Sequence, residues 1–358
     1  MSRKLVTIRT VSEIKPIANA DMIELAIVDG WQLVTKKGEF KIGDRAVYCE
    51  IDSFLPIRPE FEFLRRSSYK KMGGEEEGFR LKSAKLRGEI SQGLLLPLSV
   101  VNLTGEENDE DLAALLGVKL YEPPVPAQLA GKVVGMFPSF IQKTDQERVQ
   151  NLTGKLWGTG SVVTYTDGDG NEITKVIPPA PKRKYEVSEK LNGSSCTIFN
   201  YGDKFGVCSR NLQLEEDPEN SFWKMAIKYN LREKLLGHNV AIQGELCGEG
   251  IQKNKYKLKG QDLFVFDIFD IEARRYFSPE ERSSFLSRVT PELNSVPILE
   301  RDFEVSDDIG TLLTYAQGAS KVNSQQEREG LVFKEEGTSL DRFSFKAISN
   351  NFLLAEKD

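Results

Sequence analysis

The segment VSEKLNGSSCTIF (residues 187–199) places Lys190 directly before an Asn-Gly pair, between two runs of strand-forming residues. The alternation before the lysine is typical of a β-strand, and Asn-Gly is the strongest short signal for a two-residue hairpin turn. We therefore expect a hairpin with Lys190 exposed at the end of a strand. A lysine beside a turn is often only a solvated charge, so this segment alone does not establish a site.

The composition is that of a globular chain with two domains. At 358 residues the chain exceeds the size, about 300 residues, at which a single core usually stops growing. No run reaches the apolar length of a membrane span, and the charged N-terminus lacks the apolar core of a signal peptide, so we expect neither membrane insertion nor secretion. Four scattered cysteines without CxxC spacing indicate core thiols in a reducing compartment, which favours the cytoplasm.

The charged residues limit the available chemistry. The chain has one histidine, His238, which follows an apparent helix-ending glycine and is expected to cap or cover that helix. This argues against Ser-His-Asp, Cys-His and histidine-metal mechanisms, because each needs an imidazole at the reacting centre. An enzyme of this composition must work with Lys, Arg, Asp and Glu. The net charge of -6 argues against a broad nonspecific nucleic-acid binder but permits a local basic face.

The chain changes character near residue 122. Residues 1–122 alternate short strand-like runs with turn residues, which is typical of a small barrel or sandwich, and end in an expected helix within 105–117. The proline-rich run 121–131 marks a boundary. We therefore predict a first domain over 1–122, a linker over 123–136 and a second domain over 137–358.

The second domain mixes helices and strands. Helices are expected over 217–237, with Asp217 as N-cap, and over 278–289, with Ser278 as N-cap. Apolar strand-like runs precede and follow them. The fold class indicated is α+β, with antiparallel sheets and flanking helices.

Four charged residues interrupt these apolar runs. Glu245 stands in IQGELCG, Glu329 precedes the run GLVF, Lys334 ends that run, and Lys346 stands in SFKAIS. Burying an unpaired charge costs several kcal/mol, so these side chains should pair with one another or with a charged ligand. A purely structural network of ion pairs is the alternative for each of them.

The ordered set of motifs resembles the covalent nucleotidyltransferase superfamily of polynucleotide ligases and mRNA capping enzymes. KLNG (190–193) is similar to the first motif, usually KxDG, with Asn192 in place of the aspartate. The later motifs follow in the superfamily's order: CSRNLQL (208–214), IQGELCG (242–248), LFVFDIFD (263–270), EGLVFK (329–334) and SFKAIS (344–349).

Within that superfamily the chain is most similar to RNA ligases of the Deinococcus and Naegleria type. They carry an N-terminal OB domain, whereas capping enzymes carry a C-terminal one, for which we expect no room after the last motif. The resemblance implies an N-terminal OB-fold β-barrel followed by an ATP-grasp-like nucleotidyltransferase domain. One departure is Ser344, where some relatives have a lysine, which leaves Lys346 as the phosphate contact of that motif.

The chemistry can also be argued from the residues. A lysine with an ordinary pKa of about 10.4 is almost fully protonated at neutral pH, so Lys190 needs a depressed pKa before it can attack phosphorus. A divalent cation and Lys346 would both disfavour its charged form. Without histidine ligands, Mg²⁺ or Mn²⁺ held by Glu245, Glu329 and, through water, Asn192 is the expected metal.

The resemblance implies a site and its substrates. ATP would adenylylate Lys190, and lysyl-AMP would pass its AMP to a 5'-phosphate RNA end that a 3'-OH then attacks. Catalytic roles fall on Lys190, Lys346, Glu329 and Glu245, with Phe266 as the expected stacking face for adenine. The remaining nucleotide contacts are expected at Glu189, Asn192, Ser195, Arg210 and Lys334.

An RNA-binding surface is expected at the lysine-rich segment 253–260. In KNKYKLKG the lysines alternate, which would place all of them on one face of a strand, suited to a phosphate backbone: Lys253, Lys255, Lys257 and Lys259. An edge strand protected by lysines would look the same.

Two other functions remain open from the sequence. A capping-type guanylyltransferase would use GTP, and a noncatalytic nucleic-acid-binding module could retain the ligase fold. DNA sealing is a variant of the ligase hypothesis. RNA with 5'-phosphate and 3'-OH ends, free or in a nicked duplex, is the expected partner in a role such as RNA repair, and no protein partner is inferred.

Overall fold

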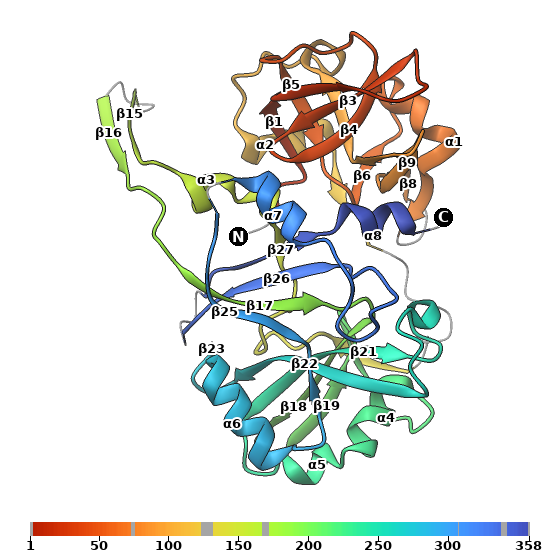
Figure 1. The fold of residues 1–358 in the computed structure, drawn as a ribbon, viewed down its shortest axis with the longest axis vertical. Coiled ribbons are helices and arrows are strands. Elements are labelled where there is room, and N and C mark those ends of the chain that lie inside the picture. Colours follow the sequence, from red (N-terminus) through yellow and green to blue (C-terminus); the bar gives the residue numbers. More distant parts are fainter. Residues whose placement is uncertain are drawn as a thin grey trace. The chain divides into compact units, whose positions relative to one another are not determined.

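The computed structural model describes residues 3–72, 76–122, 132–166, 172–306, 308–337 and 342–356. The chain divides into two compact units, Met1–Ala127 with Leu353–Asp358, and Gln128–Phe352. Figure 1 shows the elements of each unit. Most of the predicted linker, residues 123–131, lies outside the described residues.

The first unit is built mainly from short strands, as its sequence predicts. Its sheets contain β1 (Val6–Thr10), β5 (Arg45–Cys49) and β11 (Leu94–Pro97); β2 (Glu13–Pro16), β3 (Ile23–Val28) and β4 (Trp31–Lys36); β6 (Ser53–Pro56), β7 (Tyr69–Met72), β8 (Glu76–Arg80) and β12 (Lys119–Leu120); and β9 (Ser83–Leu86) with β10 (Glu89–Gln92). Its helices are η1 (Pro59–Leu64), α1 (Arg65–Ser68), η2 (Leu98–Val101) and α2 (Asp109–Leu116). Helix α2 confirms the predicted helix, since the Asn108 side chain caps its start and Gly117 ends it at a left-handed φ of 69°.

The second unit contains two sheets that flank the motif residues. The larger sheet has the order β13 (Val133–Met136), β20 (Leu212–Leu214), β19 (Lys204–Cys208), β18 (Ser194–Tyr201), β21 (Val240–Gly248), β22 (Gln261–Asp270) and β23 (Arg275–Tyr276), with β24 (Asn294–Ser295) beside β22. The smaller sheet has the order β14 (Glu147–Arg148), β27 (Ser344–Ile348), β26 (Gly330–Glu335), β17 (Lys184–Lys190) and β25 (Ile298–Glu304). The pairing is antiparallel except for β14 with β27 and β22 with β24.

Helices cover the outer face of each sheet. On the larger sheet, α4 (Ser221–Lys228), α5 (Leu231–Lys234) and α6 (Pro279–Val289) pack their apolar residues against those of β18, β21 and β22. On the smaller sheet, α7 (Ile309–Tyr315) and α3 (Thr153–Trp157) do the same against β17, β26 and β27. The remaining helices are η4 (Val149–Asn151), η5 (Gln252–Asn254) and α8 (Asn350–Ala355). Because side chains alternate along a strand, the residues between these apolar ones point to the inner faces.

The helix expected over 217–237 is shorter and broken. It begins at Ser221, because the side chain of Asn220, rather than Asp217, accepts hydrogen bonds from the backbone of Phe222 and Trp223. It is interrupted at Asn230, whose left-handed φ of 49° separates α4 from α5. The second expected helix is confirmed as α6, with a capping box formed by Ser278 and Glu281.

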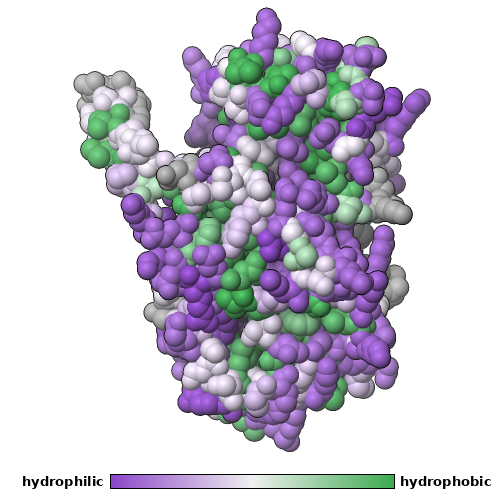
Figure 2. All heavy atoms as spheres, viewed as in Figure 1, coloured by the Kyte–Doolittle hydropathy of each residue, from purple (hydrophilic) through white to green (hydrophobic). Residues whose placement is uncertain are grey.

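A two-stranded ribbon, β15 (Ser161–Thr166) paired with β16 (Glu172–Ile177), extends from the second unit (Figure 1). Val162 and Val176 face each other across it and are both largely exposed, and apolar side chains are visible on the ribbon in Figure 2. The four cysteines are buried and free, which confirms the prediction of core thiols. In the described part of the chain, no helix has the length and apolar run that a membrane crossing requires.

Candidate active site

Lys190 lies at the end of β17, where the chain crosses from the smaller sheet to the larger one. Strand β17 pairs with β25 and β26, whereas β18 pairs with β19 and β21, so the predicted Asn-Gly hairpin is wrong. The glycine serves close packing instead, since a Cβ on Gly193 would lie only 2.4 Å from the carbonyl oxygen of Leu246. The crossing therefore delivers Lys190 to the space between the sheets, where its side chain is 26% exposed.

Strand alternation brings the charged motif residues of the smaller sheet to one face. The side chains of Tyr185, Val187, Phe333, Phe345 and Ala347 enter the core under α7. Their neighbours on the same strands must point the other way, toward the larger sheet. These neighbours are Glu186, Lys190, Lys334 and Lys346.

Lys190 forms an ion pair with Glu329. The distance from Lys190 Nζ to Glu329 Oε1 is 2.8 Å, and the glutamate is 16% exposed. Burial opposes the charge of the lysine, but the fields of Glu329 and Glu245 outweigh it, so the pKa of Lys190 is raised. Among the described residues alone, Lys190 therefore does not have the depressed pKa that we expected for it.

Glu245 approaches the same point from the larger sheet. Its Oε1 accepts a hydrogen bond of 3.0 Å from the backbone N–H of Gly193. Burial raises the pKa of Glu245 to about 7, and Lys190 opposes this shift. Ser195 is paired with Glu245 in the register of β18 and β21, and its hydroxyl lies 3.0 Å from that of Thr144.

Lys346 lies beside a second cation that the sequence analysis did not assign. In the parallel pairing of β14 with β27, Arg148 is directly opposite Lys346. Burial, Lys190 and Arg148 together lower the pKa of Lys346 to about 7. Arg148 stands in the run ERVQ, and no local pattern in the sequence indicates that this run pairs with a strand 198 positions later.

Lys334 is occupied within the protein. Its Nζ donates to the carbonyl oxygen of Phe266 at 2.6 Å and forms an ion pair with Asp267 at 2.9 Å, and its side chain is 4% exposed. Burial lowers the pKa of Lys334 to about 8, although Asp267 opposes this. The ammonium of Lys334 is thus turned toward β22, and the predicted contact of Lys334 with the nucleotide stays a prediction.

Of the other residues expected to contact the nucleotide, some lie beside Lys190 and others lie apart from it. Asn192 donates to Glu329 Oε2 at 3.5 Å, so it lies beside the ion pair. Glu189 is 1% exposed on the opposite face of β17 from Lys190 and accepts a hydrogen bond of 2.7 Å from Lys321 N. Arg210 is 64% exposed and paired with Asp145 at 2.7 Å. Asn192 thus joins the site directly, whereas Glu189 braces the loop that leads to Glu329.

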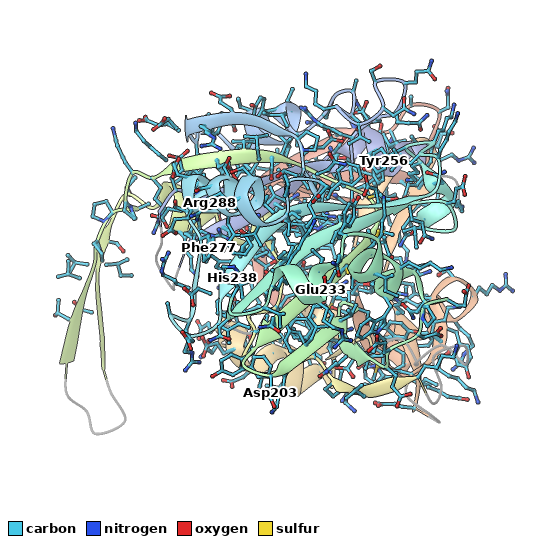
Figure 3. The ribbon with its side chains drawn as sticks, turned by 90° about the horizontal axis from the view of Figure 1, so that it is seen from below. Asp203, Glu233, His238, Tyr256, Phe277 and Arg288 are labelled. Carbon is cyan, nitrogen blue, oxygen red and sulfur yellow. The ribbon has the colours of Figure 1, made fainter. Side chains whose placement is uncertain are left out.

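The segment with the alternating lysines is not a strand. Residues 249–260 connect β21 to β22 through the short helix η5, and Lys253 and Lys257 have left-handed φ values of 58° and 54°. A left-handed residue breaks the two-residue period of a strand, so the predicted common face of Lys253, Lys255, Lys257 and Lys259 is wrong. The connection has another role that the sequence did not indicate. The hydroxyl of Tyr256, the residue labelled in Figure 3, accepts a hydrogen bond of 2.7 Å from Asn192 N.

The oxygen atoms of Glu245, Glu329 and Asn192 are compatible with a divalent cation that is bound partly through water. Among the described residues no three His, Cys, Asp or Glu side chains gather as a complete metal site. Glu329 is nevertheless close enough to Glu245 that its charge helps to raise the pKa of Glu245, and Asn192 Oδ1 is buried without a hydrogen-bond partner in the described structure. A buried acceptor of this kind suits a metal-bound water.

His238 is remote from this chemistry. It stacks edge-on against Phe285 at 5.2 Å between ring centroids, as does Phe277 at 5.7 Å (Figure 3). This placement agrees with the expected surface role at the end of α5 and leaves the site with lysines, an arginine and carboxylates.

Two facing sheets with a half-buried lysine, two carboxylates and a second lysine between them define a covalent nucleotidyltransferase. An RNA ligase family model matches residues 183–348, and an OB-fold domain model matches residues 5–98. The chain belongs to the RNA ligase family, in the group with an N-terminal OB-fold domain.

Solved structures of an RNA ligase from Naegleria gruberi are similar over the full chain. A lysine-to-methionine variant with AMP and Mn has a TM-score of 0.80 and 41% identity, covering 99% of this chain and 100% of that one. The same ligase with PPi has a TM-score of 0.79 and 42% identity over 98% of each chain. A lysine-to-alanine variant with ATP and Mn has a TM-score of 0.78 and 41% identity over 98% of each chain. No curated protein sequence matches the chain.

Proposed function

We propose that the protein is an ATP-dependent RNA ligase that joins 3'-OH and 5'-phosphate ends through three successive transfers. Lys190 attacks the α-phosphate of ATP, and pyrophosphate leaves as lysyl-AMP forms. The AMP passes to the 5'-phosphate of RNA, and the 3'-OH then displaces AMP as the strand is sealed. The observation that carries the proposal is the 2.8 Å pair of Lys190 with Glu329, placed on one inner face with Lys346 and opposite Glu245.

Lys190 must lose a proton before it attacks. Glu329 Oε1 is positioned at hydrogen-bond distance to accept that proton. Arg148 acts to lower the pKa of Lys190, and Lys190 repels the charge of Lys346. The two cations therefore favour the neutral amine of Lys190 once Glu329 is neutralised or engaged elsewhere. Lys346 then contacts the α-phosphate, with Arg148 beside it.

The remaining residues hold the nucleotide. Phe266 offers its ring to adenine, and Arg210 and Ser195 lie at the ribose side of the site. Glu329, Glu245 and, through water, Asn192 would hold Mg²⁺ or Mn²⁺, which supplies charge neutralisation at the phosphates. We further infer that residues 1–122 close an OB-fold β-barrel. The adenylyltransferase domain predicted over 137–358 also takes in β13 from the predicted linker, because β13 pairs with β20 in the larger sheet.

The test is covalent labelling with α-labelled ATP or GTP in Mg²⁺ or Mn²⁺, read on a denaturing gel. We expect label from ATP in the wild type, none in Lys190→Ala, and none in the wild type after chelation of the metal. Lys184→Ala is the matched control, because Lys184 lies on the same strand but is exposed and paired with Asp302. It should label like the wild type.

Two outcomes would replace this proposal. Label from GTP alone would indicate a capping-type guanylyltransferase, and absence of label from either nucleotide in a folded protein would indicate a noncatalytic module. Where ATP labels the protein, sealing of nicked RNA compared with nicked DNA, each with a 5'-phosphate, decides the polynucleotide.

A further inference from the structure

A buried cluster of charges lies between the two sheets, away from Lys190. Asp267 on β22 accepts two hydrogen bonds from Arg342, at 2.9 and 2.8 Å, and pairs with Lys334 on β26 at 2.9 Å. The side chains of Asp267, Lys334 and Arg342 are each only 3–4% exposed. Breaking a buried ion pair is costly, so the shared Asp267 carboxylate holds Lys334 and Arg342 in one arrangement.

The cluster is attached to the aromatic residue next to Asp267. Lys334 Nζ donates to the carbonyl oxygen of Phe266 at 2.6 Å and lies 5.1 Å from the centroid of the Phe266 ring. A cation at this distance from a ring is attracted by its π-electrons. One ammonium group therefore holds both the backbone and the ring of Phe266.

The backbone at Phe266 is irregular where the lysine holds it. Along β21 and β22, Gln243 pairs with Asp267 and Gly244 with Val265, so Phe266 is the extra residue of a β-bulge. Bulges redirect a side chain and are frequent beside active sites. The Phe266 ring packs against a separate, hydrophobic cluster that contains Leu191, the residue directly after Lys190. The direction of this ring thus depends on a bulge that a lysine from the facing sheet secures.

We propose that Lys334, with Asp267 and Arg342, is a positioning residue that aims the Phe266 ring at the adenine base. The proposal rests on the proposed function, in which Phe266 is the stacking face for ATP. It predicts that Lys334 contributes to recognition of the base and contributes nothing to recognition of the phosphates, which is opposite to the role that its motif suggests.

The experiment measures equilibrium binding by calorimetry in a Lys190→Ala background, where no covalent transfer intervenes. ATP with Mg²⁺ and inorganic triphosphate with Mg²⁺ are compared for the parent and for Lys334→Met. We expect the Kd for ATP to rise about 5- to 10-fold, the size of a lost aromatic contact, and the Kd for inorganic triphosphate to change less than about twofold.

Arg282→Met is the matched control. Arg282 also forms a buried ion pair between elements of this unit, with Glu186 at 2.7 Å, and its side chain is 5% exposed. Glu186 is opposite Lys334 in the register of β17 and β26, so the control removes a buried cation nearby without touching Phe266. We expect it to leave the ratio of the two Kd values unchanged.

A second variant tests whether the effect passes through the ring. In a Phe266→Ala background, Lys334→Met should cause no further loss of ATP affinity. Equal weakening of ATP and triphosphate, an equal effect of Arg282→Met, or an undiminished effect without the ring would each overturn the proposal. If Lys334→Met is unfolded in a thermal melt, Lys334→Gln takes its place in the same comparison. A wild type that binds ATP but is never labelled would refute the proposed function while these affinities still decide the role of Lys334.

Discussion

Gly193 offers the sharpest test of how the crossing between the sheets positions Lys190, the proposed nucleophile. A Cβ added there would lie 2.4 Å from Leu246 O, 2.8 Å from Cys247 Sγ and 2.9 Å from Glu245 Cγ. An unstrained carbon–oxygen contact is about 3.3 Å, so Gly193→Ala must shift the turn against β21 by roughly 1 Å. The first of these neighbours is a backbone atom within a central strand and cannot rotate away.

The shift should reduce both stability and activity. Overpacking of this kind costs about 1–3 kcal/mol, which corresponds to a fall in melting temperature of roughly 2–4 °C per kcal/mol for a unit of this size. Misplacement of a reacting group by about 1 Å can slow chemistry on the order of 100-fold. We therefore expect single-turnover labelling from α-labelled ATP to slow far more than the loss of folded protein explains.

Gly135→Ala is the control, because Gly135 lies in β13 of the same unit and a Cβ there would meet nothing within 4 Å. It should label and melt like the wild type. A Gly193→Ala protein that labels at the wild-type rate would refute the argument that close packing at this glycine sets the position of Lys190.

Three further changes test the electrostatics and support of the site. Burial raises the pKa of Glu245 from 4.5 to about 7, so between these values the unfolded state ionises first and stability falls as pH rises. At pH 8 the free energy of unfolding of Glu245→Gln should therefore exceed that of the wild type by about 1–3 kcal/mol, and the difference should vanish near pH 4.5. A difference that does not depend on pH would contradict this. Glu329→Gln removes the partner that holds the proton on Lys190, so the pKa of Lys190 should fall. Mass spectrometry of Lys190 after reaction with an amine reagent should then show modification beginning at lower pH than in the wild type, and an unchanged midpoint would argue against the pair. Tyr256→Phe leaves the Asn192 N–H without its acceptor, at a cost of about 1–3 kcal/mol, and should lower the melting temperature and slow labelling. Unchanged labelling would mean that Tyr256 does not support the turn.

Local signals predicted the elements with strong caps or alternation. The acidic first turn and following glycine indicated α2, and Ser278 with Pro279 indicated α6. The same kind of signal was wrong for α4, since Asn220 rather than the predicted Asp217 caps this helix. It was also wrong for the lysine segment, where left-handed residues at Lys253 and Lys257 break an alternation that the letters alone suggest.

The sequence by itself singled out the charged residues that we propose carry the chemistry, because charges placed in apolar strands are costly and their order matches one superfamily. It could not determine their partners. The Asn-Gly pair indicated a hairpin, yet the chain crosses to another sheet, because the pairing of β17 with β26 and of β18 with β21 joins residues far apart in sequence. Only the tertiary structure placed Glu329 against Lys190, Arg148 beside Lys346, and Lys334 against Phe266 and Asp267. The physical reason is that a strand's own pattern fixes which side chains share a face, whereas the energy of a buried charge depends on which other strand lies opposite it.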